Sequence, residues 1–150
     1  MARPVGRNEP HLHLAQALKQ AQRAVEQALD AALASLDLSV SLYGALFLLA
    51  GDSGMSTATL ARRAGVKPQS AAHVVARLEE LGMVSRTPHP DLGRVLRVRL
   101  TTVGRQALAK ASMVMVNAEA QLTEGMTGAE CDQLLGQLDR LRARTYELDR

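Results

Sequence analysis

The sequence is poor in aromatic residues and has one cysteine. Tyr43, Phe47 and Tyr146 are its only aromatic side chains. Without more aromatics, the core must be built from Ala, Leu, Val and Met, and such a composition favours helices over sheets. The single cysteine, Cys131, excludes an intrachain disulfide and fits a reducing cytosol.

Long hydrophobic runs are also missing. Residues 1–10 carry two arginines and two prolines with no apolar run behind them, so no signal peptide is expected. The apolar patch at 46–50 is far too short to span a bilayer. We therefore predict a cytoplasmic protein that has no membrane partner.

The residue patterns typical of catalysis and metal binding are absent from the sequence. His11 and His13 are two residues apart, so they point in different directions on a helix. No Cys, His, Asp and Glu cluster has metal-ligand spacing, and no nucleophile–base pattern or phosphate-binding loop is present. We expect no enzyme activity, no cofactor and no metal.

Positive charge is concentrated in the middle of the chain. Residues 62–105 hold nine basic and three acidic side chains, a net charge of +6 within a total of +3, which leaves −3 for the rest. This distribution indicates a polyanionic partner, although a solvated charged surface is an equal alternative.

Apolar residues recur every three or four positions in the N-terminal and C-terminal parts of the chain. This spacing predicts a helix over 11–36, a helix from Thr101 to about 123, and a last helix opened by the capping box Thr127–Glu130. The first helix would be about 40 Å long. It is too long to bury its apolar stripe within its own subunit, so we expect it to pack against a second one.

The middle of the chain has the order expected of a winged helix-turn-helix. Short helices are predicted over 40–50, 57–64 and 68–82, and Gly65 supplies the turn between the last two, with Ala61 at the helix crossing and Val66 pointing inward. The period changes over 94–100, and the strict alternation within it, at 96–100, predicts a strand with one buried face, paired with a strand over 83–88. The predicted fold class is therefore mainly α with a small β-hairpin wing.

The helix over 68–82 carries the side chains predicted to read DNA. Gln69, His73 and Arg77 are four residues apart and share one side of it; glutamine suits adenine edges and arginine suits guanine. Ser70 suits a base or a phosphate. Lys67 stands at the N-cap, offers no acceptor to the free backbone N–H groups, and is predicted to reach a phosphate. The alternative for this face is plain solvation.

The hairpin supplies a second set of predicted DNA contacts. Arg94 follows the turn and is predicted to enter the minor groove, where the potential is most negative. Arg86, Arg97 and Arg99 would take phosphates, and Arg62 and Arg63 are further candidates. For Arg97 and Arg99, an equal alternative is strand solubility and edge protection.

The chain resembles the MarR (multiple antibiotic resistance regulator) family. Four fragments carry the resemblance, in order and at the family's separations: LSVSLYGAL at 38–46, LARRAGV at 60–66, LEELGMVSR at 78–86 and VRLTTVG at 98–104. The resemblance implies one domain over 1–150, with dimerisation helices at 11–36 and 102–150 and a DNA-binding lobe at 38–101. It also implies a homodimer on a pseudo-palindromic duplex, released by a small ligand that binds between the two lobes.

The sequence departs from the family pattern at two positions. Leu92 stands where the family wing usually carries an aspartate that steadies the arginine, and His73 stands where relatives commonly have arginine. For His73 a neutral base or phosphate contact is favoured over a pH switch. The walls predicted for the ligand pocket are Tyr43, Phe47, Met113 and Met115, for each of which plain core is the stronger alternative.

The sequence thus favours a sequence-specific, homodimeric, DNA-binding transcriptional repressor released by a small molecule. Two alternatives remain open. One is a winged-helix protein-interaction module without DNA binding, which the +6 segment argues against. The other is a redox-sensing regulator acting through Cys131, whose expected position in the last helix favours a core role instead.

Overall fold

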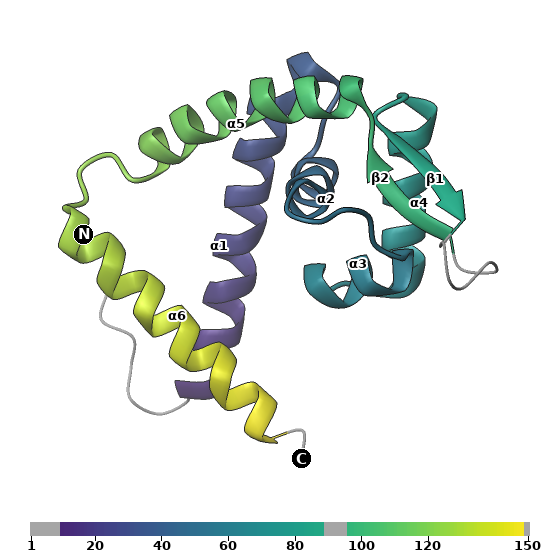
Figure 1. Ribbon diagram of the computed structural model, residues 1–150. Coiled ribbons are helices and arrows are strands. Elements are labelled where there is room, and N and C mark those ends of the chain that lie inside the picture. Colours follow the sequence, from purple (N-terminus) through teal and green to yellow (C-terminus); the bar gives the residue numbers. More distant parts are fainter. Residues whose placement is uncertain (1–9, 89–95, 149–150) are drawn as a thin grey trace. The chain divides into compact units, whose positions relative to one another are not determined.

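The computed structural model describes residues 10–88 and 96–148 of the chain (Figure 1). The chain divides into two compact units, Met1–Ala118 and Glu119–Arg150. The elements of the first unit are α1 (Pro10–Leu33), the short 3-10 helix η1 (Ala34–Leu36), α2 (Val40–Ala50), α3 (Thr57–Ala64), α4 (Pro68–Glu80), β1 (Val84–Pro88), β2 (Leu96–Leu100) and most of α5 (Thr102–Leu122). The second unit contains the end of α5 and α6 (Gly128–Leu148).

These elements confirm the predicted fold class of a mainly helical chain with one β-hairpin. The first helix is shorter than predicted, because the chain tightens into η1 after Leu33 and Asp37 then adopts a left-handed conformation with φ of 54°. The residues 57–64 form the predicted helix, and α4 ends at Glu80, two residues before Gly82. The helical periodicity therefore locates the elements well, and the errors lie at their ends.

Side-chain caps fix where α2 and α3 begin. The Ser39 Oγ accepts a hydrogen bond from the Leu42 N–H at 3.3 Å, and the Ser56 Oγ accepts one from the Thr59 N–H at 3.1 Å. The Asp30 carboxylate of α1 accepts a bond from the Val40 N–H at 2.7 Å. One free N–H group in the first turn of α2 is therefore bonded by a side chain of α1, and this bond joins the two helices.

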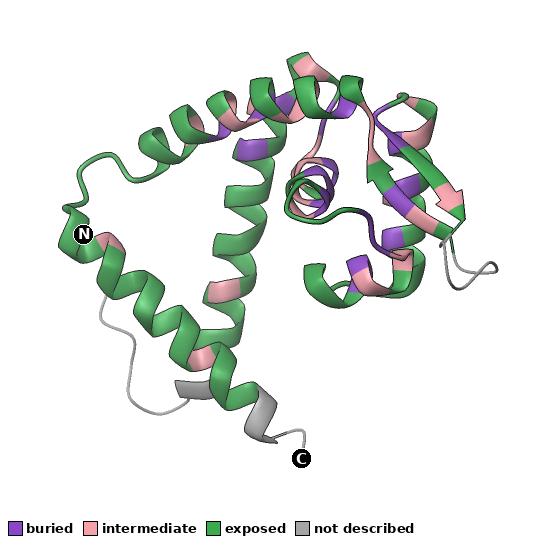
Figure 2. Cartoon of the chain, in the orientation of Figure 1, coloured by how far each residue is buried: buried purple, intermediate pink, exposed green. Residues whose placement is uncertain are grey.

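An aliphatic core holds α2, α3, α4 and the hairpin together, and the buried side chains concentrate on these elements in Figure 2. Leu46 of α2, Leu60 of α3, Val75 and Leu78 of α4 and Val98 of β2 are all 1% exposed or less. Burying an aliphatic side chain of this kind stabilises the fold by roughly 1.5–3 kcal/mol. The core therefore sets the positions of α3, α4 and β2 relative to one another.

The hairpin pairs β1 and β2 in antiparallel register, from Val84 opposite Leu100 to Pro88 opposite Leu96. Met55, in the loop between α2 and α3, pairs with Val98 on the outer side of β2. The prediction of one buried face is only partly correct: Val98 is fully buried, whereas Leu96 is 46% exposed. The buried face ends where the strand leaves the core.

A tight corner joins the hairpin to α5. The Thr101 Oγ1 donates to the Gly82 carbonyl at 2.6 Å and accepts from the Gly104 N–H at 3.0 Å, so it caps the helix as predicted. A Cβ atom at Gly104 would stand 1.9 Å from the Met83 carbonyl oxygen. Only glycine allows α5 to approach the Met83 carbonyl, between α4 and β1, this closely.

The second unit begins its helix with the predicted capping box. The Glu130 carboxylate accepts a bond from the Thr127 N–H at 2.7 Å, and the Thr127 Oγ1 accepts one from the Glu130 N–H at 3.3 Å. Bonds from the backbone and then the hydroxyl of Thr127 lower the pKa of Glu130. Large apolar side chains of α6 are exposed, with Leu134, Leu135 and Leu138 between 41% and 61%.

Among the described residues, no single helix is both long and apolar enough to cross a membrane. One pair, His13–Leu36 with Val40–Ala50, has a sufficient combined length and composition but is bent by 75° at its break.

Candidate nucleic-acid interface

The turn between α3 and α4 is built by a glycine in a left-handed conformation. Gly65 has φ of 67° and ends α3, with its N–H and that of Val66 donating to the carbonyls of Arg62 and Ala61. Ala61 and Ala71 are each 2% exposed, so small side chains lie in the core beneath the motif, as predicted for Ala61. The prediction that Val66 points inward is wrong, because Val66 is 45% exposed.

One face of α4 is left free by this packing. Ala71, Val75 and Leu78 are buried on the inner side of the helix, whereas Gln69 and His73 are exposed on the opposite side. Ser70 and Arg77 are also exposed, towards one edge of that face. The structure therefore brings the four side chains predicted to read DNA onto the solvent-facing half of one helix.

Two alanines that the sequence prediction omitted share this face. Ala72 and Ala76 are exposed on α4, beside Gln69 and His73. Small side chains allow a helix backbone to sit deep in a groove, and the alanine methyl group is a suitable contact for the methyl group of thymine. The sequence did hold a signal for them. Both alanines fall on the predicted solvent-facing side of the helix, where no packing against the core requires a small side chain.

The N-terminus of α4 lacks a side-chain cap in the described structure. Lys67 occupies the N-cap with extended backbone angles and makes no side-chain cap hydrogen bond, and Pro68 follows it in the first turn. The carbonyl of Lys67 accepts from the Ala71 N–H at 3.1 Å, which starts the helical ladder. The N–H groups of the first turn, next to a lysine, form a suitable binding position for a phosphate.

Two of the arginines predicted to contact DNA, one at a base and one at a phosphate, are paired with carboxylates. Arg77 Nη1 lies 2.9 Å from Glu80 Oε2 on the exposed side of α4. Arg86 Nε lies 2.9 Å from Glu79 Oε2 and so connects β1 to α4. Exposed pairs contribute about 0–1 kcal/mol, so either arginine can exchange its carboxylate for a phosphate at small cost.

Arg97 is placed differently from the other predicted contacts. Its side chain is half-buried, and its Nε donates to the Gly54 carbonyl at 2.9 Å. Arg99, two residues further along β2, is exposed. Arg94 and Leu92, on which the wing prediction rests, lie outside the described residues.

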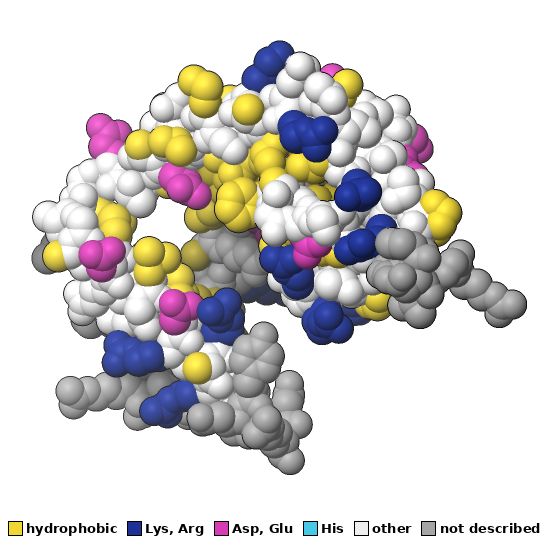
Figure 3. Space-filling model, viewed as in Figure 1, with side chains coloured by type: hydrophobic (Ala, Val, Ile, Leu, Met, Phe, Trp, Pro, Cys, Tyr) yellow, Lys and Arg dark blue, Asp and Glu magenta, His cyan; other side chains and the backbone are white. Residues whose placement is uncertain are grey.

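Basic side chains gather over the region of α3, α4 and the hairpin on the face shown in Figure 3. Arg62 and Arg63 belong to the last turn of α3, where they also suit the negative end of the helix dipole. Arg63 pairs with Asp52 at 3.3 Å. Among the described residues, no group of three or more His, Cys, Asp or Glu side chains could hold a metal ion.

A groove of about 510 Å³ lies on the side of α4 away from Gln69 and His73. Its volume is within the range of small-molecule sites. Its walls come from α1, α2, α3, the Gly65 turn and the back of α4, and most of the lining side chains are apolar. Phe47 of α2, 61% exposed, lies against it, and Glu26 of α1 is its one charged lining residue among the described ones. Ser70 lines it from α4.

The four side chains predicted as ligand-pocket walls do not all line this groove. Phe47 lines the groove, whereas Met115 is in the core at 7% exposure and Met113 is 71% exposed on α5. The Tyr43 hydroxyl is 3.5 Å from the Ser112 Oγ, and its ring is 6.2 Å from that of Phe47. Cys131 of α6 is a half-buried free thiol.

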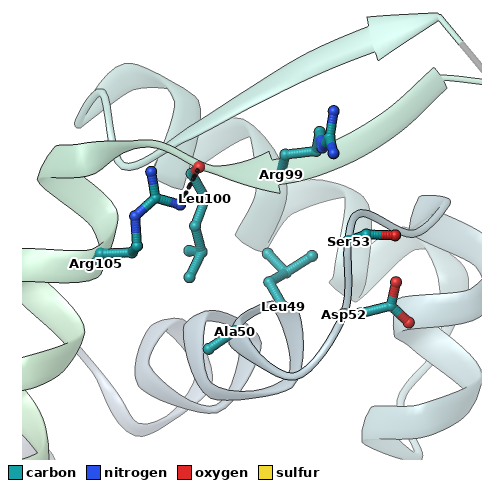
Figure 4. Close-up of a pocket in the computed structure, with 7 residues that line it drawn as sticks. All are labelled: Leu49, Ala50, Asp52, Ser53, Arg99, Leu100 and Arg105. Atoms are coloured by element: carbon teal, nitrogen blue, oxygen red, sulfur yellow. Dashed lines mark hydrogen bonds between the residues drawn. The ribbon is translucent and has the colours of Figure 1, made fainter.

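A second, smaller pocket of about 170 Å³ lies where the loop after α2 meets β2 and the start of α5 (Figure 4). Arg99, Arg105, Asp52 and Ser53 border it, and Arg105 Nη1 donates to the Leu100 carbonyl at 3.3 Å. Its volume is below the usual range for small-molecule sites. The groove is therefore the better candidate for an effector.

Known proteins resemble this chain in both sequence and structure. A model of the MarR family matches residues 36–95. The HTH-type transcriptional repressor Rv2887 of Mycobacterium tuberculosis is 33% identical over 112 residues, which cover 75% of this chain and 81% of that protein.

Two solved structures of regulators show the same fold along almost the whole chain. The repressor CouR bound to a 23-mer DNA duplex has a TM-score of 0.83 at 27% identity, covering 93% of this chain and 99% of CouR. The organohalide-sensing regulator RdhR-CbdbA1625, in its 2,4-dichlorophenol-bound form, has a TM-score of 0.85 at 26% identity, covering 99% and 91%.

Proposed function

Because the chain belongs to the MarR family of transcriptional regulators, we propose that it is a repressor that binds a specific duplex DNA sequence as a homodimer. The observation that carries the proposal is the solvent-facing half of α4, where Gln69 and His73 stand above a buried face of Ala71, Val75 and Leu78. A helix held in this way can enter a major groove and present polar side chains to base edges.

The proposed contacts divide into two kinds. Gln69, His73 and Arg77 read bases, with Ala72 beside them for a thymine methyl group. The positions for phosphates are Lys67, Ser70 and Arg86. Arg94 is proposed as a minor-groove contact, on the sequence alone. Phosphate contacts set affinity and salt dependence, whereas base contacts set sequence preference.

The proposed dimer uses the helices outside the DNA-binding lobe, at 11–36 and 102–150. Exposed apolar side chains on α1, α5 and α6 support this assignment, including Leu14, Val116 and Leu135. A second copy would bury these side chains and would place two recognition helices on one duplex, as a pseudo-palindromic site requires.

The proposed effector site is the groove behind α4. A molecule bound there would contact Val66 of the turn and Ser70 and Val74 of the recognition helix, together with Gln22 and Glu26 of α1. RdhR-CbdbA1625 is described with 2,4-dichlorophenol bound. By analogy we propose a small aromatic ligand, with Phe47 as the ring that packs against it. We also propose that the protein is cytoplasmic and has no catalytic activity.

A binding-site selection tests the proposal. The full chain is incubated with a pool of random duplexes, and the retained fragments are sequenced and used in gel shifts at 50 mM and 200 mM salt. We expect a pseudo-palindromic sequence whose binding weakens steeply with salt. No retardation at either salt concentration would instead favour the protein-interaction module.

The variant Gln69→Ala separates base reading from phosphate contact. We expect it to cost about 1–3 kcal/mol on the selected sequence and to relax preference at one base pair per half-site. Gln20→Ala, an exposed glutamine of α1, is the matched control and should bind like the wild type. An equal loss on every sequence would demote Gln69 to a phosphate contact.

A further inference from the structure

The hairpin is bonded to the loop that precedes α3, and through this loop to the helix-turn-helix. Met55 and Val98 exchange two backbone hydrogen bonds, of 3.2 Å and 2.8 Å. Both residues are buried, at 4% and 0% exposure. The loop therefore acts as a one-residue edge strand on β2, and this pairing sets the distance between hairpin and α3.

Arg97 adds a side-chain bond next to this pairing. On β2 it neighbours Val98 but faces the other side of the sheet, and its Nε donates to the Gly54 carbonyl at 2.9 Å. Gly54 is buried, although it lies in a loop, and has φ of 124°. Its N–H donates to the Asp52 Oδ1 at 3.2 Å. The carbonyl that Arg97 reaches is therefore held in a fixed position.

The same loop is connected to the far end of α3. Asp52 Oδ2 lies 3.3 Å from Arg63 Nη1, in the last turn of that helix, and Ser56 caps its first turn. A continuous set of contacts thus runs from Arg63 through Asp52 and Gly54 to Arg97. It joins both ends of α3 to the strand that carries the wing.

We propose that Arg97 is a positioning residue, which sets the wing relative to the helix-turn-helix through its bond to the Gly54 carbonyl, and that it does not contact DNA phosphate. The Arg97 Nε is hydrogen-bonded to the loop carbonyl. Arg99, on the same strand face, also lies against Gly54 through its side chain but is exposed. The effect on DNA binding rests on the proposed function, but the bond itself can be tested without DNA.

Two substitutions separate the hydrogen bond from the charge. In glutamine the side-chain amide nitrogen is as many bonds from Cα as Nε is in arginine, so Arg97→Gln keeps a donor for Gly54 and loses the charge. Arg97→Met keeps similar length and loses both. Arg99→Gln removes the same charge from the same strand face and is the matched control.

The first measurement is amide hydrogen exchange in the free protein. We expect exchange of the Met55 and Val98 amides to rise about tenfold in Arg97→Met, equivalent to about 1.4 kcal/mol, and less than threefold in Arg97→Gln and Arg99→Gln. Unchanged exchange in Arg97→Met would overturn the proposal, whether or not the protein binds DNA. If Arg97→Met does not fold, a tenfold rise in Arg97→Gln overturns it instead.

The second measurement is DNA binding to the selected duplex, with hydroxyl-radical and guanine-methylation footprints. We expect Arg97→Met to bind about tenfold more weakly, to lose protection at the minor grooves and to keep protection in the major grooves. Arg97→Gln should bind within about twofold of the wild type with the same salt slope. A salt slope that is flatter by about 0.9 for each Arg97 replaced by glutamine would make Arg97 a phosphate ligand and overturn the proposal.

Discussion

At the scale of single residues, the closest packing constraint in the described structure is at Gly104. A side chain there would meet the Met83 carbonyl oxygen at 1.9 Å, and that oxygen also accepts the Thr101 N–H at 3.0 Å. Backbone atoms on both sides leave little room for relaxation. Gly104 has ordinary helical backbone angles, so its conformation does not require glycine. The close contact with Met83 does.

We expect Gly104→Ala to lower the free energy of unfolding by about 3 kcal/mol, because the added methyl group forces α5 away from Met83. Urea denaturation followed by circular dichroism measures the change. Gly44→Ala in α2 is the matched control: its Cβ meets nothing within 4 Å, so it should gain about 1 kcal/mol. Equal behaviour of the two variants would contradict the close approach.

Lys67 offers a second test at this scale. Lys67→Asp supplies a cap for α4 and should raise the free energy of unfolding by about 0.5–1 kcal/mol. The same carboxylate would occupy the N–H groups and repel a phosphate, so DNA affinity should fall at least tenfold. Thermal unfolding and gel shifts measure the two effects. A variant that is more stable and binds DNA normally would show that no phosphate sits at this helix end.

At the scale of elements, the sequence predicts the helices well because each carries aliphatic residues at helical spacing. The capping box at Thr127 was recognisable because capping depends on residues within three positions of each other, as the caps of Ser39 and Ser56 also do. The bond between Arg97 and Gly54 spans 43 positions, so no local pattern reveals it. For the same reason the ion pair of Arg86 with Glu79 could not be predicted.

The capping box of α6 gives a pH-dependent prediction. Hydrogen bonds from Thr127 lower the pKa of Glu130 below its ordinary 4.5. A carboxyl group with a lowered pKa in the folded state stabilises it above the ordinary pKa, and this contribution is lost as the pH falls through the lowered value. The helix should therefore fray at its first turn at acid pH.

Amide exchange at Glu130 and Cys131 follows this fraying. Between neutral pH and pH 4.5 the wild type should be better protected than Glu130→Ala, which lacks the carboxylate, and the two should converge as the carboxylate is protonated. Glu124→Gln, outside the box, serves as control and should keep the wild-type profile. A constant difference between wild type and Glu130→Ala down to acid pH would rule out the contribution of the carboxylate charge.

At the scale of the whole molecule, the main feature is a set of large apolar side chains that a single subunit leaves exposed to solvent. Val116 is 66% exposed, Met113 71% and Leu135 61%. The sequence predicts a second subunit from the length of the first helix and from the family resemblance. It places the ligand walls less well, because Phe47 and Met115 are both apolar, yet Phe47 is exposed at the groove and Met115 is buried in the core.

We expect the protein to sediment as a dimer and its unfolding midpoint to rise with concentration. Leu135→Glu should shift it towards monomer and reduce DNA affinity by at least tenfold, since two half-sites would no longer be bound together. Gln133→Glu, a nearby exposed position on α6, adds the same charge and should remain dimeric. Sedimentation equilibrium measures the molecular mass of each variant. A monomeric wild type would refute the proposed dimer.

The bond from the Val40 N–H to the Asp30 carboxylate has a mechanical consequence. Because this bond ties α1 to the first turn of α2, one wall of the groove, we expect a rotation of α1 to move that turn. A change in spacing between two subunits would thus alter the groove, and filling the groove would push back on α1. Cutting this link, as in Asp30→Ala, should leave a protein that still binds its DNA but no longer responds to its inducer.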